Sequence, residues 1–335
     1  MLANQTSDSL AASLTAPFER SVKPAVSPAE RTLPQVQLAG KCDCYVLSNG
    51  VELPCLGFGT YMVPNDDTGA AAIRGALDLG FRHIDTATSY KNEDLVGRVI
   101  RESGIPRSEI FITSKLNNPD QGYDETMTAF QRSIDWLGTD YLDLYLIHWP
   151  KVAATVDHWE HQVRETWRAF EDLYRAGRIR AIGVSNFLVH HMETLLETAT
   201  VAPMVDQLEL NPTYQQREIV AWCQEHGVQL EAWGPLGRGH IFKHEGVAAL
   251  AARLGKDVGQ VCVRYALQKG FVTMPKSTKP ARIKSNSEVF DFELSAEDMA
   301  LLDSLQDDNS YYVHPDRLDE WGERVARAHA ESGVA

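Results

Sequence analysis

Ionisable side chains end three successive apolar runs of the sequence, a position that packing alone does not explain. Asp85 ends one run, Lys115 the next and His148 the one after. Carboxylate, ammonium and imidazole groups are those that enzymes use to transfer protons and stabilise charge. A single such residue is usually a solvated charge or a hydrogen-bonded core residue. Three ionisable residues at the same end of successive apolar runs predict one reacting centre.

Eight short apolar runs alternate with longer segments of helical periodicity. The runs cover residues 56–58, 81–84, 111–114, 142–147, 179–184, 204–210, 228–233 and 271–274. Near-continuous apolar strands separated by helices indicate parallel pairing that is buried on both faces. Eight such units within about 240 residues favour a closed (β/α)₈ TIM barrel over an open sheet. In such a barrel the polar residues at the strand ends converge on one mouth.

Further segments extend this barrel at both ends. Asn49-Gly50 between two apolar runs predicts a β-hairpin cap over residues 45–54, because both residues tolerate positive φ. Additional C-terminal helices are expected over residues 247–254 and 295–305, the second beginning with a capping box. The tail that follows holds Tyr311, Tyr312 and Trp321, and aromatic side chains there can cover the mouth.

Residues 1–40 differ in composition from the rest of the chain. They are rich in Ser, Ala, Thr and Pro and show no sustained period. Such a segment buries too little surface to offset its ordering entropy. We therefore expect a flexible leader over residues 1–40 and a single barrel domain with its tail over residues 41–335.

The bulk composition limits the partners and the compartment. Thirty-two basic and 46 acidic residues give a net charge of −14, which argues against nucleic acid and anionic membranes as partners. The chain has no run of about 18 apolar residues that could span a membrane. Five cysteines, an odd number, suit a reducing compartment, and Cys42 and Cys44 lack a second Cys or His pair for a metal. We expect a cytoplasmic protein without a metal, as a monomer or weak dimer.

Several motifs in the same order resemble those of the aldo-keto reductase family. Residues 85–90 read Asp-Thr-Ala-Thr-Ser-Tyr, Lys115 lies in Thr-Ser-Lys-Leu, and His148 lies in Ile-His-Trp-Pro. Supporting matches are residues 56–60, 183–187, Gln207 with Asn211-Pro212, 233–237, and 275–277 followed by Arg282 and Asn286. The resemblance covers residues 45–306. The Trp-Gly-Pro-Leu-Gly motif at 233–237 is similar to the 2,5-diketo-D-gluconate reductase branch.

The resemblance implies a catalytic tetrad of Asp85, Tyr90, Lys115 and His148. Hydride delivery to a carbonyl carbon leaves charge on its oxygen, so a proton donor must stand beside that oxygen, and this is the implied role of Tyr90. The Lys115 ammonium is expected to lower the pKa of the Tyr90 phenol, and Asp85 to hold Lys115. A neutral His148 would hydrogen-bond the substrate carbonyl. The implied activity is NADPH-dependent reduction of aldehydes or ketones to alcohols.

The resemblance also implies which residues contact NADPH. They are Thr60, Ser185, Asn186, Gln207, Trp233, Gly234, Pro235, Leu236, Lys276, Ser277, Arg282 and Asn286. Ser185, Asn186 and Gln207 would bind the nicotinamide carboxamide, and Trp233 would stack on the ring. Lys276, Ser277 and Arg282 would hold the 2′-phosphate, since an Arg fork fits phosphate oxygens.

The expected substrate pocket has walls of Tyr61 and Trp149 beside His148. Asn117 stands where the family often has Trp, so a more polar pocket is expected, which favours hydroxylated or dicarbonyl substrates over steroids. Ser285 stands where an acidic residue commonly precedes the Asn at Asn286. One contact to the adenine of the cofactor therefore lacks its usual residue.

Three other interpretations fit the sequence less well. Residues 265–269 match the Tyr-x-x-x-Lys pattern of short-chain dehydrogenases, but an amphipathic helix explains them and no third glycine follows Gly57 and Gly59. A noncatalytic, cofactor-binding regulatory protein on the same barrel would have an eroded tetrad, whereas all four positions are intact. A barrel hydrolase would need paired carboxylates or metal ligands, and Asp85 is the only acid among the strand-end residues considered.

Overall fold

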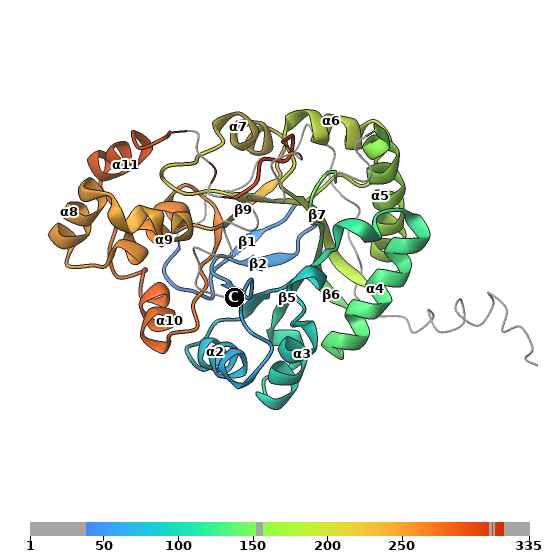
Figure 1. Ribbon diagram of the computed structural model, residues 1–335, viewed down its shortest axis with the longest axis horizontal. Coiled ribbons are helices and arrows are strands. Elements are labelled where there is room, and N and C mark those ends of the chain that lie inside the picture. Colours follow the sequence, from blue (N-terminus) through green and yellow to red (C-terminus); the bar gives the residue numbers. More distant parts are fainter. Residues whose placement is uncertain (1–37, 152–156, 308–309, 311, 318–335) are drawn as a thin grey trace, which may run out of the picture.

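A barrel of eight parallel strands forms the centre of the molecule, which the computed structural model describes over residues 38–151, 157–307, 310 and 312–317 (Figure 1). The strands are β3 (Phe58–Gly59), β4 (His83–Asp85), β5 (Phe111–Leu116), β6 (Leu142–Ile147), β7 (Ile179–Ser185), β8 (Val205–Glu209), β9 (Gln229–Trp233) and β10 (Val272–Met274). They pair in sequence order. A parallel bridge between Leu56 and Thr273 joins the first strand to the last and closes the barrel. All eight strands predicted from the sequence are confirmed, and so is the TIM barrel.

Helices surround the barrel, and all of the following except α10 lie between two of its strands in the sequence (Figure 1). They are α2 (Asp67–Asp78), α3 (Glu93–Glu102), α4 (Tyr123–Leu137), α5 (Trp159–Arg175), α6 (Val189–Leu196), α7 (Arg217–Glu225), α9 (Val258–Gln268) and α10 (Pro280–Ser287). The short 3₁₀ helices are η2 (Thr88–Tyr90), η3 (Arg107–Glu109), η4 (Asn118–Asp120) and η6 (Gly237–Lys243). Helices bury their apolar stripe against the strands, as α5 does with Val163, Trp167, Phe170 and Tyr174.

Two further helices confirm the expected C-terminal additions. They are α8 (Glu245–Leu254) and α11 (Ala296–Asp303). The predicted capping box of α11 is present: the Asp298 amide donates to Ser295 Oγ at 3.2 Å, and the Ser295 amide donates to Asp298 Oδ2 at 3.1 Å. These two bonds satisfy amide donors that the first turn of a helix leaves without partners.

The predicted hairpin is present and covers the amino end of the barrel. Strands β1 (Cys44–Val46) and β2 (Glu52–Pro54) pair antiparallel. Of the two turn residues, Gly50 takes a positive φ, of 85°, and Asn49 does not. The Asn49 side chain is buried instead. Its Nδ2 donates to the Arg180 carbonyl at the start of β7 at 2.9 Å, and its Oδ1 accepts from the Val51 amide.

The hydrophobic core lies between the barrel and its helices, and α8 and α11 share a second, smaller cluster with α9. Within the described ranges, none of the helices combines the length and apolar character needed to cross a membrane. The leader predicted for residues 1–40 lies, up to residue 37, outside the described residues, and its boundary stays a prediction.

Candidate active site

The barrel's pairing register gathers polar side chains at the carboxyl ends of the strands. Asp85 pairs with Thr113, so Lys115 lies two residues further along β5 on the same face. Ser185 pairs with Gln207, and Gln207 pairs with Glu231 on β9. Because paired residues of parallel strands point to the same face, these side chains form one layer inside the mouth.

Lys115 and Asp85 form the charged centre of this layer. The Lys115 ammonium donates to Asp85 Oδ1 at 2.6 Å and Oδ2 at 2.7 Å, and to the Thr86 carbonyl at 3.1 Å. Both side chains are buried, so the pair is held with little screening by solvent. The Tyr90 hydroxyl accepts a fourth, longer contact from Lys115 at 3.3 Å.

Tyr90 is the last residue of η2, the 3₁₀ turn that follows β4, and this turn places its hydroxyl near Lys115. Its ring lies 5.1 Å from that of Tyr61 and 5.7 Å from that of His148, centroid to centroid. Burial raises the pKa of the Tyr90 phenol well above its usual range, and the negative charge of Asp85 adds to this. The expected net lowering of this pKa by Lys115 is therefore wrong, because burial of the phenol is the larger influence and the Asp85 carboxylate also raises the pKa.

His148 directly follows β6, and its ring meets the Tyr90 ring edge to face. Burial lowers the pKa of His148 well below its usual range, and the positive charge of Lys115 acts in the same direction. The imidazole is thus neutral at neutral pH, as expected from the sequence. Its Nδ1 lies 3.4 Å from Ser89 Oγ.

A second group of polar side chains lies on the neighbouring strands. Asn186 Nδ2 donates to Ser185 Oγ and to the His148 carbonyl, both at 3.0 Å, and Asn186 Oδ1 accepts from Trp233 Nε1 at 3.0 Å. Ser185 Oγ donates to the Gln207 carbonyl at 2.7 Å. The structure thus links the residues expected at the nicotinamide in one hydrogen-bonded chain beside the tetrad.

Glu231 is a member of this layer that the sequence analysis did not identify. It is fully buried in β9, and its Oε2 accepts from Gln207 Nε2 at 2.8 Å. Gln207 Nε2 also donates to Asp85 Oδ2 at 2.8 Å. The sequence does contain a signal for Glu231, because it is an acidic residue within the apolar run 228–233 that is predicted to be a buried strand.

Tyr312, from the C-terminal tail, closes the mouth from outside. Its hydroxyl lies 3.3 Å from that of Tyr61, and its ring centroid lies 6.2 Å from that of Trp149 and 5.9 Å from that of Trp233. The Arg238 guanidinium lies over the Tyr312 ring at 5.0 Å. The covering tail proposed from the sequence is thus present at Tyr312, while Tyr311 and Trp321 lie outside the described residues.

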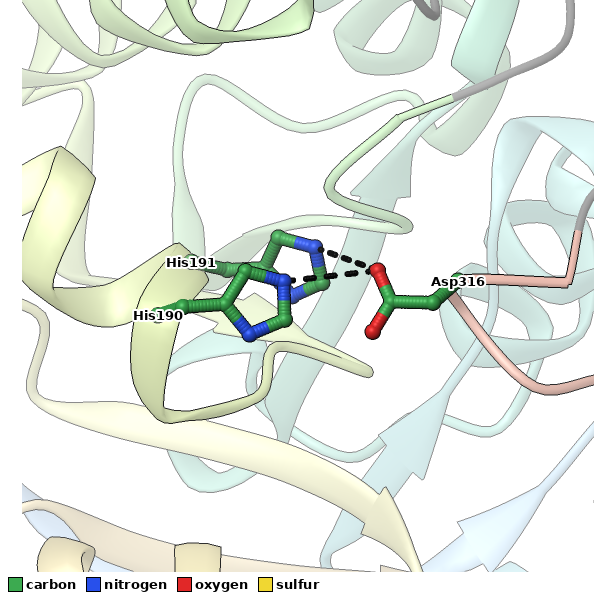
Figure 2. Close-up of side chains that lie close together, drawn as sticks. All are labelled: His190, His191 and Asp316. Carbon is green, nitrogen blue, oxygen red and sulfur yellow. Dashed lines mark ion pairs between the residues drawn. The ribbon is translucent and has the colours of Figure 1, made fainter.

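Asp316 anchors the same tail segment to the start of α6, as Figure 2 shows. Asp316 Oδ1 lies 2.5 Å from Lys151 Nζ, 3.3 Å from His190 Nε2 and 3.4 Å from His191 Nε2. His191 Nδ1 accepts from the Leu188 amide, which leaves the ring proton on Nε2, facing the carboxylate. His190, His191 and Asp316 are close enough together to hold a metal ion. The proton on His191 Nε2 and the competing Lys151 ammonium instead favour an ion-paired carboxylate that fixes the tail. We refer to this group as the Asp316 anchor.

The residues expected at the 2′-phosphate lie after β10. Arg282 is exposed in the first turn of α10, and its guanidinium has no hydrogen bond or ion pair within the described part of the chain. Lys276 is partly buried beside the end of β3, and burial lowers the pKa of its ammonium. Ser277 Oγ accepts from the Lys279 amide. The positive end of the helix dipole disfavours a cation such as Arg282 at a helix start. Its position there is better explained by binding of an anion.

The remaining residues expected to contact the cofactor follow β3 and β9 or lie in α10. Thr60 donates to the Asp85 carbonyl through its amide and its hydroxyl, both at 2.9 Å. Gly234, with a φ of 61°, begins the turn through Pro235 and Leu236 in which the Gly237 amide donates to the Gly234 carbonyl. Asn286 is buried in α10, and the preceding Ser285 hydrogen-bonds the Asp257 carboxylate.

Comparisons with known proteins agree with this geometry. The sequence model of the aldo/keto reductase family matches residues 55–307. Glyoxal reductase of Bacillus subtilis (strain 168) is 48% identical over 276 residues, which are 82% of this chain and 97% of that protein. A solved aldo-keto reductase from a Medee basin deep-sea metagenome library superposes with a TM-score of 0.77 at 42% identity, covering 81% of this chain and 98% of its own. The Bombyx mori aldo-keto reductase in complex with NADP gives a TM-score of 0.73 at 33% identity, covering 81% of this chain and 95% of its own.

Proposed function

This chain belongs to the aldo/keto reductase family, and from that premise we propose that it reduces aldehydes or ketones to alcohols with NADPH, using Tyr90 as the proton donor. The observation that carries the proposal is the Lys115 ammonium, which contacts both the Asp85 carboxylate and the Tyr90 hydroxyl. In this arrangement the Tyr90 hydroxyl can donate a proton, the Lys115 ammonium can stabilise negative charge on an oxygen, and Asp85 holds Lys115 in place.

Tyr90 would give its proton to the substrate oxygen. A raised pKa keeps the phenol protonated at neutral pH, so the donor form is the resting form. An alkoxide is a far stronger base than a phenolate, so the proton moves downhill once charge develops. Lys115, at 3.3 Å, would then stabilise the phenolate that remains, and the buried site strengthens that interaction.

His148 would hold the carbonyl in place. If the Ser89 hydroxyl donates to Nδ1, the imidazole carries its own proton on Nε2, which can donate to the substrate oxygen. A neutral imidazole suits this role, because a charged one beside Lys115 would be repelled. The substrate oxygen would thus lie between Tyr90 and His148, whose rings are 5.7 Å apart.

The residues at the mouth fit NADPH, which supplies the hydride when it is bound. Ser185, Asn186 and Gln207 offer donors and acceptors for the carboxamide, and Trp233 offers a flat face for the ring. The guanidinium of Arg282 and the ammonium of Lys276 would hold the 2′-phosphate. NADP in the Bombyx mori relative and NADPH in a second solved relative, a mutant of Gox0644, support this choice of cofactor.

The pocket favours small polar carbonyl compounds. The Tyr61 ring lies beside that of Tyr90, the Tyr312 ring lies beside those of Tyr61 and Trp149, and Arg238 lies over the Tyr61 and Tyr312 rings. We infer that this group of aromatic rings favours small substrates, and that the Arg238 cation favours electron-rich oxygens. We propose small dicarbonyl compounds of the glyoxal type, in line with the activity that the Bacillus subtilis relative is named for.

A noncatalytic cofactor-binding role remains the alternative, and the intact Asp85, Lys115 and Tyr90 contacts speak against it. A cytoplasmic location, a monomeric or weakly dimeric state and the diketogluconate branch also remain predictions.

The test of the proposed activity is consumption of NADPH and NADH with glyoxal, methylglyoxal, an aromatic aldehyde and a steroid ketone. We expect turnover with NADPH that is fastest for the dicarbonyls. Tight NADPH binding without turnover of any carbonyl compound would establish the noncatalytic role instead.

A further inference from the structure

One buried carboxyl group in the barrel has no part in the proposed reaction. Glu231 occupies the middle of β9, is fully buried, and lies directly opposite Gln207 in the register. A Leu of similar size could fill this place without burying a polar group, which carries a desolvation penalty unless it is hydrogen-bonded. The hydrogen bond from Gln207 is the contact that offsets this penalty.

The Gln207 amide is held by two carboxyl groups at once. Its Nε2 donates one hydrogen to Asp85 Oδ2 and the other to Glu231 Oε2, each at 2.8 Å. An amide has chemically different ends, with two donors on nitrogen and only acceptors on oxygen. With both hydrogens directed at carboxyl oxygens, Gln207 Oε1 must point away from them.

We infer that Glu231 is a positioning residue, which fixes the Gln207 amide so that its Oε1 presents an acceptor to the carboxamide NH₂ of the nicotinamide. The inference rests on the proposed role of Gln207 at the cofactor. Asp85 alone leaves the amide with one acceptor and a free hydrogen. Glu231 supplies the second acceptor, and a flipped amide would set its oxygen against both carboxyl groups.

The charges around Glu231 are consistent with this role. The ionisable groups that act on it are Asp85 from β4 and Lys115 from β5, and the neutral Gln207 amide contacts it from β8. Burial raises the pKa of Glu231 to about 8, Asp85 adds to the rise, and Gln207 and Lys115 oppose it. At neutral pH the group is thus mostly protonated and accepts from Gln207 without adding a second negative charge beside Asp85. Its Oε1, which has no hydrogen-bond partner within the described residues, is left to carry the proton.

The test compares two ligands that share the adenosine end but differ at the nicotinamide end. NADPH and 2′,5′-ADP would be titrated against the wild type, Glu231→Leu and Glu231→Gln. We expect Glu231→Leu to weaken NADPH binding by about 5- to 10-fold, the effect of one neutral hydrogen bond, and to leave 2′,5′-ADP binding unchanged. Glu231→Gln should bind NADPH nearly as the wild type does, because its side-chain carbonyl can accept from Gln207. Glu231→Met replaces the Leu variant if the latter does not fold.

A coupling experiment separates this inference from a general loss of structure. In a Gln207→Leu background, Glu231→Leu should have no further effect on NADPH binding. Unchanged NADPH affinity in Glu231→Leu, equal losses for both ligands, or a full additional loss in the Gln207→Leu background would each overturn the inference. A wild type that binds NADPH but reduces no carbonyl compound would instead overturn the proposed function, and the binding comparison would still stand.

Discussion

Lys115 directs its ammonium to both carboxylate oxygens of Asp85, at 2.6 and 2.7 Å, while the Tyr90 hydroxyl lies further away at 3.3 Å. The lysine is therefore primarily the partner of a buried acid and only secondarily the neighbour of the phenol. Removing one partner of a buried ion pair strongly destabilises the folded protein, because the other charge is left buried without compensation. Loss of Lys115 should thus affect both folding and turnover, and the two effects can be separated.

We expect Lys115→Met to lower kcat by at least about 100-fold, because the phenolate of Tyr90 loses its stabilising charge. The same variant should lose about 3–5 kcal/mol in the free energy of unfolding. Adding Asp85→Asn removes the uncompensated carboxylate, so the double variant should recover much of this stability but not the rate. Denaturant unfolding and steady-state assays would measure both. Recovery of kcat in the double variant would show that Lys115 acts only through the fold.

Glu231 makes stability depend on pH in a defined direction. Its pKa of about 8 in the folded protein exceeds the ordinary value of 4.5, so between these values the unfolded chain releases a proton that the folded protein keeps. Glu231 therefore lowers stability progressively as pH rises through this window. We expect the Tm of Glu231→Gln, measured by calorimetry at a series of pH values, to rise progressively relative to that of the wild type between pH 5 and pH 8. A constant Tm difference across that range would contradict a buried, protonated carboxyl group.

Arg282 should control the choice between the two nicotinamide cofactors. Its exposed guanidinium has no partner within the described residues and stands at the start of α10. Arg282→Ala should weaken NADPH binding by about 10- to 150-fold, through loss of a charge-assisted contact to the 2′-phosphate, and should barely change NADH binding. Lys284→Ala, which removes an exposed cation paired with Glu288 on the same helix, is the matched control. Equal losses for both cofactors in a fluorescence titration would refute the 2′-phosphate role.

The Asp316 anchor should act on substrate binding rather than on chemistry. The contact from His191 holds the pKa of Asp316 well below its usual range, and Lys151 contributes to this, so the anchor is charged throughout the neutral range. Asp316→Ala should loosen the segment that carries Tyr312 and raise KM for a small aldehyde several-fold, with kcat changed little. Glu297→Ala, on the exposed first turn of α11, is the control. An unchanged KM would contradict this role, and a response of wild-type KM to added Zn²⁺ would favour a metal site.

The parts of the site that lie on strands could be predicted from the sequence, and those that depend on contacts across the mouth could not. Asp85, Lys115 and His148 end apolar runs, so periodicity places them. Tyr312 and Asp316 reach the site from a tail without periodicity, and nothing local indicates which groups they meet. The pKa of Tyr90 was wrongly predicted for a related reason, because the charge of Lys115 was counted without the burial of the phenol and the compensation by Asp85.

The central claim is that Tyr90 is the proton donor for carbonyl reduction with NADPH. Stopped-flow and steady-state assays of Tyr90→Phe with NADPH and glyoxal, beside a fluorescence titration of NADPH, test it most directly. The Phe ring keeps the packing against Tyr61 and removes only the hydroxyl. We predict a fall in kcat of about 10²- to 10⁴-fold, with NADPH affinity close to that of the wild type, because the hydroxyl is used in the transition state. Retention of more than about a tenth of kcat would contradict the account.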